Sequence, residues 1–168
     1  MTGAGPPHYV RCMPITFASL VDDDGWVPMP LNQQGHPNYL WEDGRPLADA
    51  PVDFAATFDG AMWVTGKPID VPAFYRNPLR VRANFMVPRH HHNIDETVFV
   101  LAGEYRIEYG DVDHPDSVLV RPGGFFTSRA GTPYTMIAGP EGVTYIETWS
   151  VPVPKLKTVW YDRGWIHR

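Results

Sequence analysis

Turn signals recur at short intervals through the second half of this chain, and they limit what it can fold into. From Leu79 onward, short runs of alternating apolar and polar residues end at pairs such as Ala102-Gly103 and Gly139-Pro140. The whole chain contains 15 Gly and 18 Pro, whereas average usage would give a chain of this length roughly 20 of the two together. Many short strands separated by turns predict an all-β sandwich or barrel and exclude a long helix bundle.

The length of 168 residues leaves room for one domain. Residues 1–55 contain recurring prolines and are predicted to form an irregular N-terminal arm with one or two edge strands, and residues 56–168 to form a barrel with a C-terminal tail. The expected strands are 79–87, 97–101, 104–109, 118–121, 125–128, 134–138 and 143–151. The tail holds Trp160, Tyr161 and Trp165, so we expect it either to dock on the barrel or to contact another subunit.

Composition and charge narrow the possible function classes. Hydrophobic residues make up 43% of the chain and aromatic residues 13%, which is enough apolar surface to exclude global disorder. The net charge of -5 offers no basic surface for nucleic acid or for an anionic membrane, and no run of 18 apolar residues is present. Cys12 has no second cysteine with which to form a disulfide, and the N-terminus lacks a signal-peptide pattern. We therefore expect a cytoplasmic protein that binds neither nucleic acid nor membrane.

Three consecutive histidines precede a carboxylate in the segment Arg89–Glu96. In an extended segment successive side chains point to opposite faces, so His90 and His92 are predicted to share one face while His91 points away. Glu96 follows where a carboxylate could complete a set of two imidazoles and one carboxylate, which is typical of non-haem Fe(II) oxygenases. The alternative is a solvated loop, because a His-rich tract by itself is only a compositional signal of metal binding.

The spacing around these histidines resembles the first motif of the cupin superfamily. That motif reads Gly, five residues, His-x-His, three or four residues, Glu, six residues and Gly. His90, His92, Glu96 and Gly103 match its last four anchors, and Asn84 stands where the leading Gly is expected.

A second cupin motif, which reads Gly, five residues, Pro-x-Gly, two residues and His, is similar in spacing to residues 123–134. Gly123 and Gly131 match it, whereas Arg129 replaces the Pro and Tyr134 replaces the His. The resemblance covers residues 79–151, about half of the chain.

The resemblance implies a double-stranded β-helix, the small cupin jelly-roll barrel, with its site in the mouth of the barrel. It assigns His90, His92 and Glu96 as metal ligands, with Fe(II) as the expected ion and Zn, Mn or Ni as alternatives. Tyr134 takes the place of the family's last histidine, and three roles stay open for it: a phenolate ligand, a hydrogen bond to substrate, or the mark of a cupin without metal. The second role is favoured, because three protein ligands already complete the facial set.

Glu147 is a candidate catalytic acid or base. It lies in a predicted strand in which Val143, Tyr145 and Trp149 alternate as core-facing residues. A carboxylate on that face would be buried and would need a partner, whereas the opposite register would expose it to solvent.

The function that these features favour is an Fe(II)-dependent dioxygenase that cleaves a carbon-carbon bond of an enolisable ketone, diketone or phenolic compound. The chain is similar in size and in its extended N-terminal segment to the hydroxyacetophenone and diketone dioxygenase group of cupins. The alternatives are a non-oxidative cyclase, isomerase or lyase that uses Zn or another divalent ion as Lewis acid, and a non-catalytic small-molecule-binding cupin. The expected partners are a small-molecule substrate, dioxygen and a second copy in a homodimer, because the arm and the tail could cover strand edges across a two-fold axis.

Overall fold

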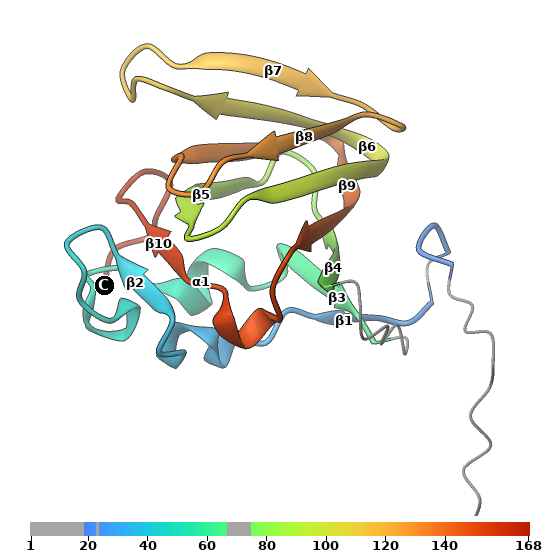
Figure 1. Ribbon diagram of the computed structural model, residues 1–168. Coiled ribbons are helices and arrows are strands. Elements are labelled where there is room, and N and C mark those ends of the chain that lie inside the picture. The colour runs from blue at the N-terminus through green and yellow to red at the C-terminus, as the bar shows by residue number, and fades with distance from the viewer. Residues whose placement is uncertain (1–18, 23, 67–74) are drawn as a thin grey trace, which may run out of the picture.

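The described part of the chain is almost entirely β-structure (Figure 1). The structure is a computed structural model, and it describes residues 19–22, 24–66 and 75–168. Its strands are β1 (Trp26–Pro28), β2 (Tyr39–Trp41), β3 (Met62–Thr65), β4 (Tyr75–Val81), β5 (Met86–His92), β6 (Glu96–Tyr109), β7 (Asp116–Val120), β8 (Phe125–Ser128), β9 (Tyr134–Trp149) and β10 (Thr158–Trp160). Its helices are the α-helix α1 (Phe54–Phe58) and the 3-10 helices η1 (Leu31–Gly35), η2 (Leu47–Asp49) and η3 (Val153–Lys155). No helix within these ranges is long and apolar enough to cross a membrane.

Two long strands, β6 and β9, run antiparallel along most of their length and organise the fold. They pair from Glu96 opposite Trp149 to Tyr109 opposite Tyr134. The other edge of β9 pairs with β4 over residues 143–149 and with β5 over residues 134–137, and the other edge of β6 pairs with β8 near its start and with β7 near its end. The β6–β9 pair is a long two-stranded ribbon, and each of its strands changes its outer partner halfway along. The ribbon therefore contributes to both layers of the barrel (Figure 1). The prediction of an all-β jelly-roll barrel is confirmed.

Two of the predicted turns are wrong, because they lie inside the long strands. The predicted strands 97–101 and 104–109 are one strand, β6, and residues 134–138 and 143–149 belong to one strand, β9. Gly103 and Gly142 have φ angles of 70° and 78°, and the register between β6 and β9 shifts on either side of Gly103. A Cβ on Gly103 would collide with the carbonyl oxygen of Gly142. These glycines therefore bend a continuous ribbon instead of reversing the chain.

The predicted strand 79–87 is also wrong, because the chain turns within it. Strand β4 ends at Val81 and β5 begins at Met86. Asn84 lies in this turn with a φ angle of 58°, and its N–H donates to the carbonyl of Gly139 over 3.0 Å. Asparagine tolerates this left-handed conformation better than other residues that carry a Cβ. Asn84 can therefore stand where the motif described above has a glycine.

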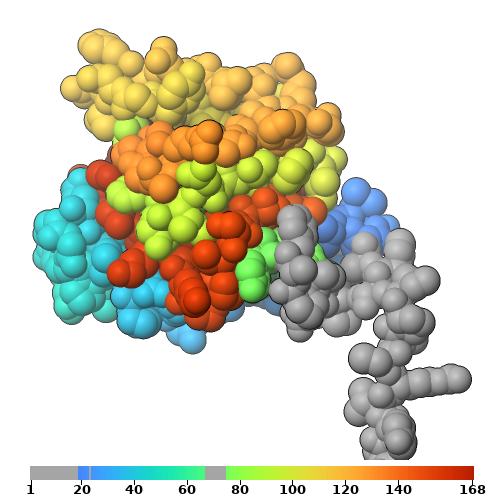
Figure 2. All heavy atoms as spheres, viewed as in Figure 1, coloured from blue at the N-terminus to red at the C-terminus, as the bar shows by residue number. Residues whose placement is uncertain are grey.

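The described part of the N-terminal arm and the C-terminal tail pack on the barrel of their own chain. The strand order β1-β3-β4-β9-β5-β10-β2 puts arm strands at both ends and inserts the tail strand β10 between β5 and β2. Figure 2 shows the red C-terminal segment in contact with blue and cyan residues of the arm. Helix α1 spans the predicted boundary at residue 55, and its Phe54 and Phe58 rings pack against Trp160 and Trp165. Residues 1–18 of the predicted arm, with Cys12, lie outside the described ranges.

Candidate functional site

The three histidines lie at the end of strand β5, where alternation separates their side chains. His90 and His92 line a cavity inside the barrel and are only 3% and 8% exposed. His91 lies on the other face of the strand, where its Nδ1 is 3.0 Å from the hydroxyl of Tyr161. The two cavity-facing imidazoles have ring centroids 5.2 Å apart. The segment is thus a strand and not a solvated loop.

Both cavity-facing imidazoles are held through Nδ1. His90 Nδ1 is 2.8 Å from the carbonyl oxygen of Pro88, and His92 Nδ1 is 3.1 Å from the hydroxyl oxygen of Thr158 on β10. These contacts orient the rings and leave Nε2 as the atom free for a ligand, as is usual for metal-binding histidines. Burial lowers the pKa of His90 to about 3, helped by the proximity of His92, and burial lowers the pKa of His92 to about 4, helped by His91. Both rings are therefore neutral near pH 7, which is the form that binds metal.

Glu96 is buried at the start of β6 between a histidine and a tyrosine. Its Oε2 accepts a short hydrogen bond from the hydroxyl of Tyr134 at the start of β9. Its Oε1 lies 3.4 Å from Nε2 of His92 and accepts no hydrogen bond from any residue that the structure describes. Burial raises the pKa of Glu96, and burial together with the nearby Glu96 carboxylate raises the pKa of Tyr134 well above its usual value. Tyr134 is therefore a phenol that donates to Glu96 in this arrangement.

The donor types in this cluster fit a divalent ion, although the ligand set is not fully assembled. Two atoms bound to one ion at about 2.1 Å would be roughly 3.0 to 3.4 Å apart, and Nε2 of His92 and Oε1 of Glu96 are 3.4 Å apart. The unpartnered Oε1 is also the kind of buried polar atom that a cation satisfies. Within residues 19–22, 24–66 and 75–168, however, no group of three or more His, Cys, Asp or Glu side chains could hold a metal ion as it stands. To bind an ion, Glu96 would use its unpartnered Oε1, or it would first lose the hydrogen bond from Tyr134 and then use Oε2.

Glu147 lies farther along β9 and enters the same cavity as the two histidines. Its carboxyl accepts from Nδ2 of Asn77 on β4 and from the hydroxyl of Tyr145, each over 3.3 Å. Burial raises the pKa of Glu147 well above its ordinary value, and the negative charge of Glu96 adds to this effect. Burial thus favours the neutral carboxylic acid form of Glu147. Of the two orientations that the sequence left open for Glu147, the structure has the core-facing one.

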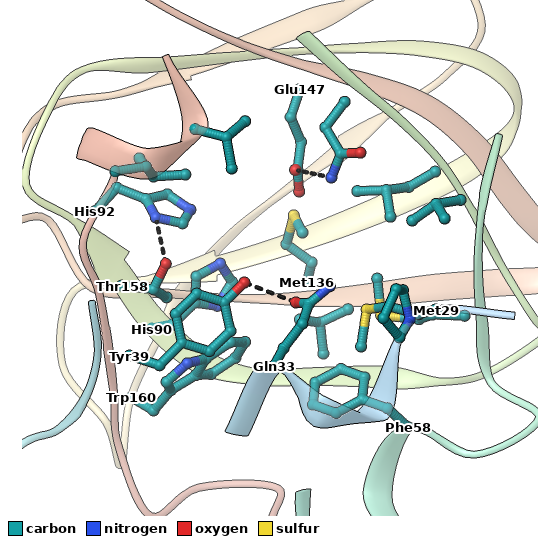
Figure 3. A pocket seen from close by; sticks show the side chains of 18 of the residues that line it. Met29, Gln33, Tyr39, Phe58, His90, His92, Met136, Glu147, Thr158 and Trp160 are labelled. Atoms are coloured by element: carbon teal, nitrogen blue, oxygen red, sulfur yellow. Dashed lines mark hydrogen bonds between the residues drawn. The ribbon is translucent and has the colours of Figure 1, made fainter. Parts of the chain in front are cut away.

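The cavity has a volume of about 340 Å³ and a mostly apolar wall (Figure 3). Figure 3 shows His92 and Glu147 projecting into it from different walls. Its described lining is Met29, Pro30, Gln33, Tyr39, Phe54, Phe58, Met62, Val64, Thr65, Asn77, Leu79, Val87, His90, His92, Met136, Tyr145, Glu147, Trp149, Val153, Leu156, Thr158 and Trp160. Its size is within the usual range for small-molecule sites.

The predicted site residues do not all face this cavity. Tyr134 lines a second cavity of about 270 Å³, together with Ile107, Val118 and Phe126. Glu96 is absent from the lining of both cavities, and it lies between them through its contacts with His92 and Tyr134.

Sequence reasoning missed Asn77 and Thr158, which hold Glu147 and His92. Asn77 lies on β4, which pairs with β9, and Thr158 lies on β10, which pairs with β5, so each comes from a strand that is distant in the chain and adjacent in the sheet. No local sequence pattern marks either residue as part of a site, and only strand pairing brings them there.

No protein-family model matches the chain, and no curated protein sequence matches it either. Among solved structures, a variant of oxalate decarboxylase from Bacillus subtilis is 17% identical with a TM-score of 0.42, and the match covers 53% of this chain and 24% of that one. Vicilin from Corylus avellana (hazelnut) is 18% identical with a TM-score of 0.47, covering 59% of this chain and 31% of that one. An 11S globulin from Wrightia tinctoria is 20% identical with a TM-score of 0.45, covering 51% and 22%.

The chain thus spans less than a third of each of these three proteins, all of which have the cupin fold. At TM-scores below 0.5, this likeness adds no argument about fold or function. The jelly roll is established by the strand pairing of the chain itself.

Proposed function

We propose that this chain is a cupin-type, Fe(II)-dependent dioxygenase that cleaves a carbon-carbon bond of an enolisable ketone, diketone or phenolic compound. One observation carries the proposal: two neutral imidazoles line an apolar cavity of small-molecule size, and the buried carboxylate of Glu96 lies 3.4 Å from one of them. Two histidines and one carboxylate with further positions open are typical of non-haem Fe(II) oxygenases.

Three side chains would hold the ion, His90 and His92 through Nε2 and Glu96 through Oε1. Pro88 and Thr158 already orient the imidazoles through Nδ1, so little side-chain freedom would be lost on binding. When bound, Fe(II) would supply the electron transfer that activates dioxygen. In the overall reaction one carbon-carbon bond breaks, one dioxygen is consumed, and each of its two oxygen atoms enters a product.

Tyr134 and Glu147 are the proposed acid-base groups. Tyr134 fixes one carboxylate oxygen of Glu96 and holds a phenolic proton beside it. Glu147 is a buried acid whose proton is available to a ligand oxygen in the cavity. Both groups hold a proton in this arrangement, so they would act as acids that donate it to an enolate or product oxygen, and not as the base that removes a proton from a ketone.

A non-oxidative enzyme is the second candidate, and the same two acids favour it. A cyclase, isomerase or lyase needs a carbonyl polarised by Zn, Mn, Ni or a similar ion and a nearby proton donor. A metal-free binding protein for small molecules is the third candidate, and the apolar cavity alone would suffice for it.

We also propose that the protein is a cytoplasmic homodimer. The tail and the described part of the arm pack within their own chain, so support for the dimer comes from another surface. Phe99 on β6 and Phe125 on β8 are 40% and 62% exposed, with ring centroids 5.6 Å apart. Among the strands that the structure describes, β7 and β8 each pair with β6 alone and so leave one edge open.

Metal analysis and oxygen uptake test the proposed function. The protein is purified without added metal, analysed for bound metal, reconstituted anaerobically with Fe(II) and screened for oxygen consumption with ketones, diketones and phenols. Stoichiometric iron and substrate-dependent uptake are expected. Metal-dependent turnover without oxygen consumption would establish the second candidate, and ligand binding without metal would establish the third.

A further inference from the structure

The second cavity, on whose wall Tyr134 lies, has an apolar interior. It has a volume of about 270 Å³ and shares no described lining residue with the first cavity, which His90 and His92 line. Its inner wall consists of the buried Ile107 and the rings of Phe126 and Tyr134, which meet edge to face with centroids 5.7 Å apart. This interior can hold the apolar body of a small molecule.

Two apolar side chains at the rim of the second cavity remain exposed to solvent. Tyr109 on β6 and Val118 on β7 both line the cavity, yet they are 41% and 45% exposed. A ligand seated in the cavity would cover part of both side chains, and removing apolar surface from water favours binding. The rim therefore favours an occupant with an apolar body.

The remaining described lining of the second cavity is polar. It consists of Arg129 and the hydroxyl side chains of Thr127, Ser128 and Thr132. The hydroxyl of Ser128 donates to the carbonyl oxygens of Arg129 and Thr132 over 3.5 Å each, which is long for such a bond, so it can turn toward a closer acceptor. A guanidinium donates hydrogen bonds and accepts none, so the head group that matches this rim is an acceptor with negative charge. A carboxylate meets both conditions.

Arg129 is held at the rim and keeps donors for a ligand. Its Nη1 donates to Oδ2 of Asp95 over 2.6 Å, and Oδ1 of Asp95 accepts from the N–H of Ala130 over 2.9 Å. A guanidinium has five N–H donors in a planar fork, so this contact leaves donors for a second carboxylate. The side chain of Arg129 is largely exposed, and water therefore limits its preference for an anion to a few-fold.

We infer that the second cavity is a separate binding site for a small monocarboxylate with an apolar body, whose carboxylate is bound by Arg129 and Ser128 at the rim. The inference is independent of the proposed function, because this site requires no metal and its described lining is different from that of the first cavity. The ligand would lie against the ring of Tyr134, beside the contact of that residue with Glu96.

Two pairs of matched ligands test the preference for a carboxylate. Benzoate and benzamide share one apolar body, hexanoate and hexanamide share another, and the members of each pair differ in the charge of the head group. Each compound is titrated into metal-free protein, and backbone amide shifts in NMR spectra give both the affinity and the location. We expect the carboxylate to bind about 3 to 10-fold more tightly in each pair.

The location of the shift changes separates the two cavities. Changes centred on residues 107–109, 116–120 and 126–134 are expected. Changes centred on residues 87–92 and 145–149, which belong to the first cavity, would overturn the inference. Equal affinities within either pair, or no binding of the carboxylates at millimolar concentration, would overturn it as well.

Replacement of Arg129 tests how the head group is bound. Arg129→Gln removes the positive charge, so the preference for benzoate over benzamide should disappear. Arg121→Gln removes the same charge at an exposed position just after β7, outside the described lining, and should keep the preference. A preference that survives in Arg129→Gln would contradict binding of the carboxylate at this rim.

Filling the second cavity tests where the apolar body lies. Val118→Trp puts a large ring into the cavity and should weaken benzoate and hexanoate binding by at least about 10-fold. Leu119→Trp makes a comparable change at the next position of β7, whose side chain points to the other face, and should keep the affinity within about 2-fold. Both positions are exposed, so both variants should fold. Equal effects of the two substitutions would argue against the cavity as the site.

A second copy of the chain is the alternative occupant, because the proposed dimer surface lies on the neighbouring strand β8. The benzoate titration is therefore repeated with Phe125→Asp, which should disrupt that surface and lies outside the described lining of the cavity. A site built by one chain should keep its affinity in this variant. Loss of benzoate binding in folded Phe125→Asp would overturn a site that one chain forms by itself.

Discussion

The hydroxyl of Tyr134 donates a hydrogen bond to Oε2 of Glu96, and this joins the first residues of the two longest strands of the barrel. The contact leaves Oε1 of Glu96 facing Nε2 of His92 at 3.4 Å. Tyr134 thereby controls which carboxylate oxygen is available beside the histidines. Its position in the spacing of the second motif and its contact with Glu96 together make it the most informative residue to change.

Replacement of Tyr134 separates its possible roles. Tyr134→Phe removes one hydroxyl and almost no volume, so the protein should fold and keep its metal, while turnover should fall by about 10 to 1000-fold. Tyr134→His should bind metal more tightly, because it adds an imidazole beside Glu96. Metal content by elemental analysis and turnover by oxygen uptake are measured for both. Loss of metal in Tyr134→Phe would instead identify a phenolate ligand, and no change in either variant would leave Tyr134 with a packing role only.

A histidine scan tests the metal site by strand alternation. His90→Ala and His92→Ala should each abolish stoichiometric metal, whereas His91→Ala should retain most of it, because that ring faces Tyr161 on the other side of β5. Elemental analysis of the three purified variants provides the measurement. Equal loss in all three would contradict the assignment of His90 and His92 as ligands.

Stability should depend on pH through Glu147. Its pKa is raised in the folded protein and ordinary in the unfolded chain, so only the unfolded chain loses this proton once the pH exceeds about 4.5. The unfolded chain then binds fewer protons, and the free energy of unfolding falls with rising pH by up to about 1.4 kcal/mol per unit from this group, until the pH passes the folded pKa. Glu147→Gln removes this dependence. The free energy of unfolding of metal-free protein is measured with urea at pH 5 and pH 8. Relative to the wild type, Glu147→Gln should be more stable at pH 8 than it is at pH 5. A stability difference that is the same at both pH values would show that Glu147 is ionised in the folded protein.

The bend of the long ribbon should depend on Gly103. Gly103→Ala puts a Cβ against the carbonyl of Gly142 at a positive φ angle, and we expect a loss of about 2 kcal/mol or more. Gly44→Ala is the control, since Gly44 has a φ angle of 85° with open space around it and should lose only about 1 kcal/mol. Chemical denaturation measures both, and equal losses would mean that the close approach of Gly103 and Gly142 is not needed.

The proposed dimer should depend on the exposed aromatic pair of β6 and β8. Phe125→Asp introduces a charge into this aromatic pair. It should convert a dimer into a monomer at micromolar concentration, as measured by sedimentation velocity. Val27→Asp changes an exposed residue of β1, at the opposite edge of that layer, and should leave the dimer intact. A wild-type protein that sediments only as a monomer would remove the dimer proposal.

Local sequence determined the class of the fold and the directions of the key side chains. Side chains alternate along an extended strand whatever the rest of the molecule does, so the common face of His90 and His92 could be predicted. The inward direction of Glu147 depended on the register of its strand and stayed open. Turn chemistry was less decisive, because a glycine with positive φ serves both a chain reversal and a bend within a strand. Ala102-Gly103 was therefore mistaken for a turn.

Only the tertiary structure decided which residues meet. The contact of Tyr134 with Glu96, the position of Asn77 opposite Glu147 and the support of His92 by Thr158 all join strands that are far apart in the chain. Their register is set by the packing of the whole barrel, and that packing depends on many side chains at once. The same packing separates the cavity lined by His90 and Glu147 from the cavity lined by Tyr134. Strand periodicity cannot predict this separation, because periodicity specifies the face on which a residue lies and not the residues that it contacts.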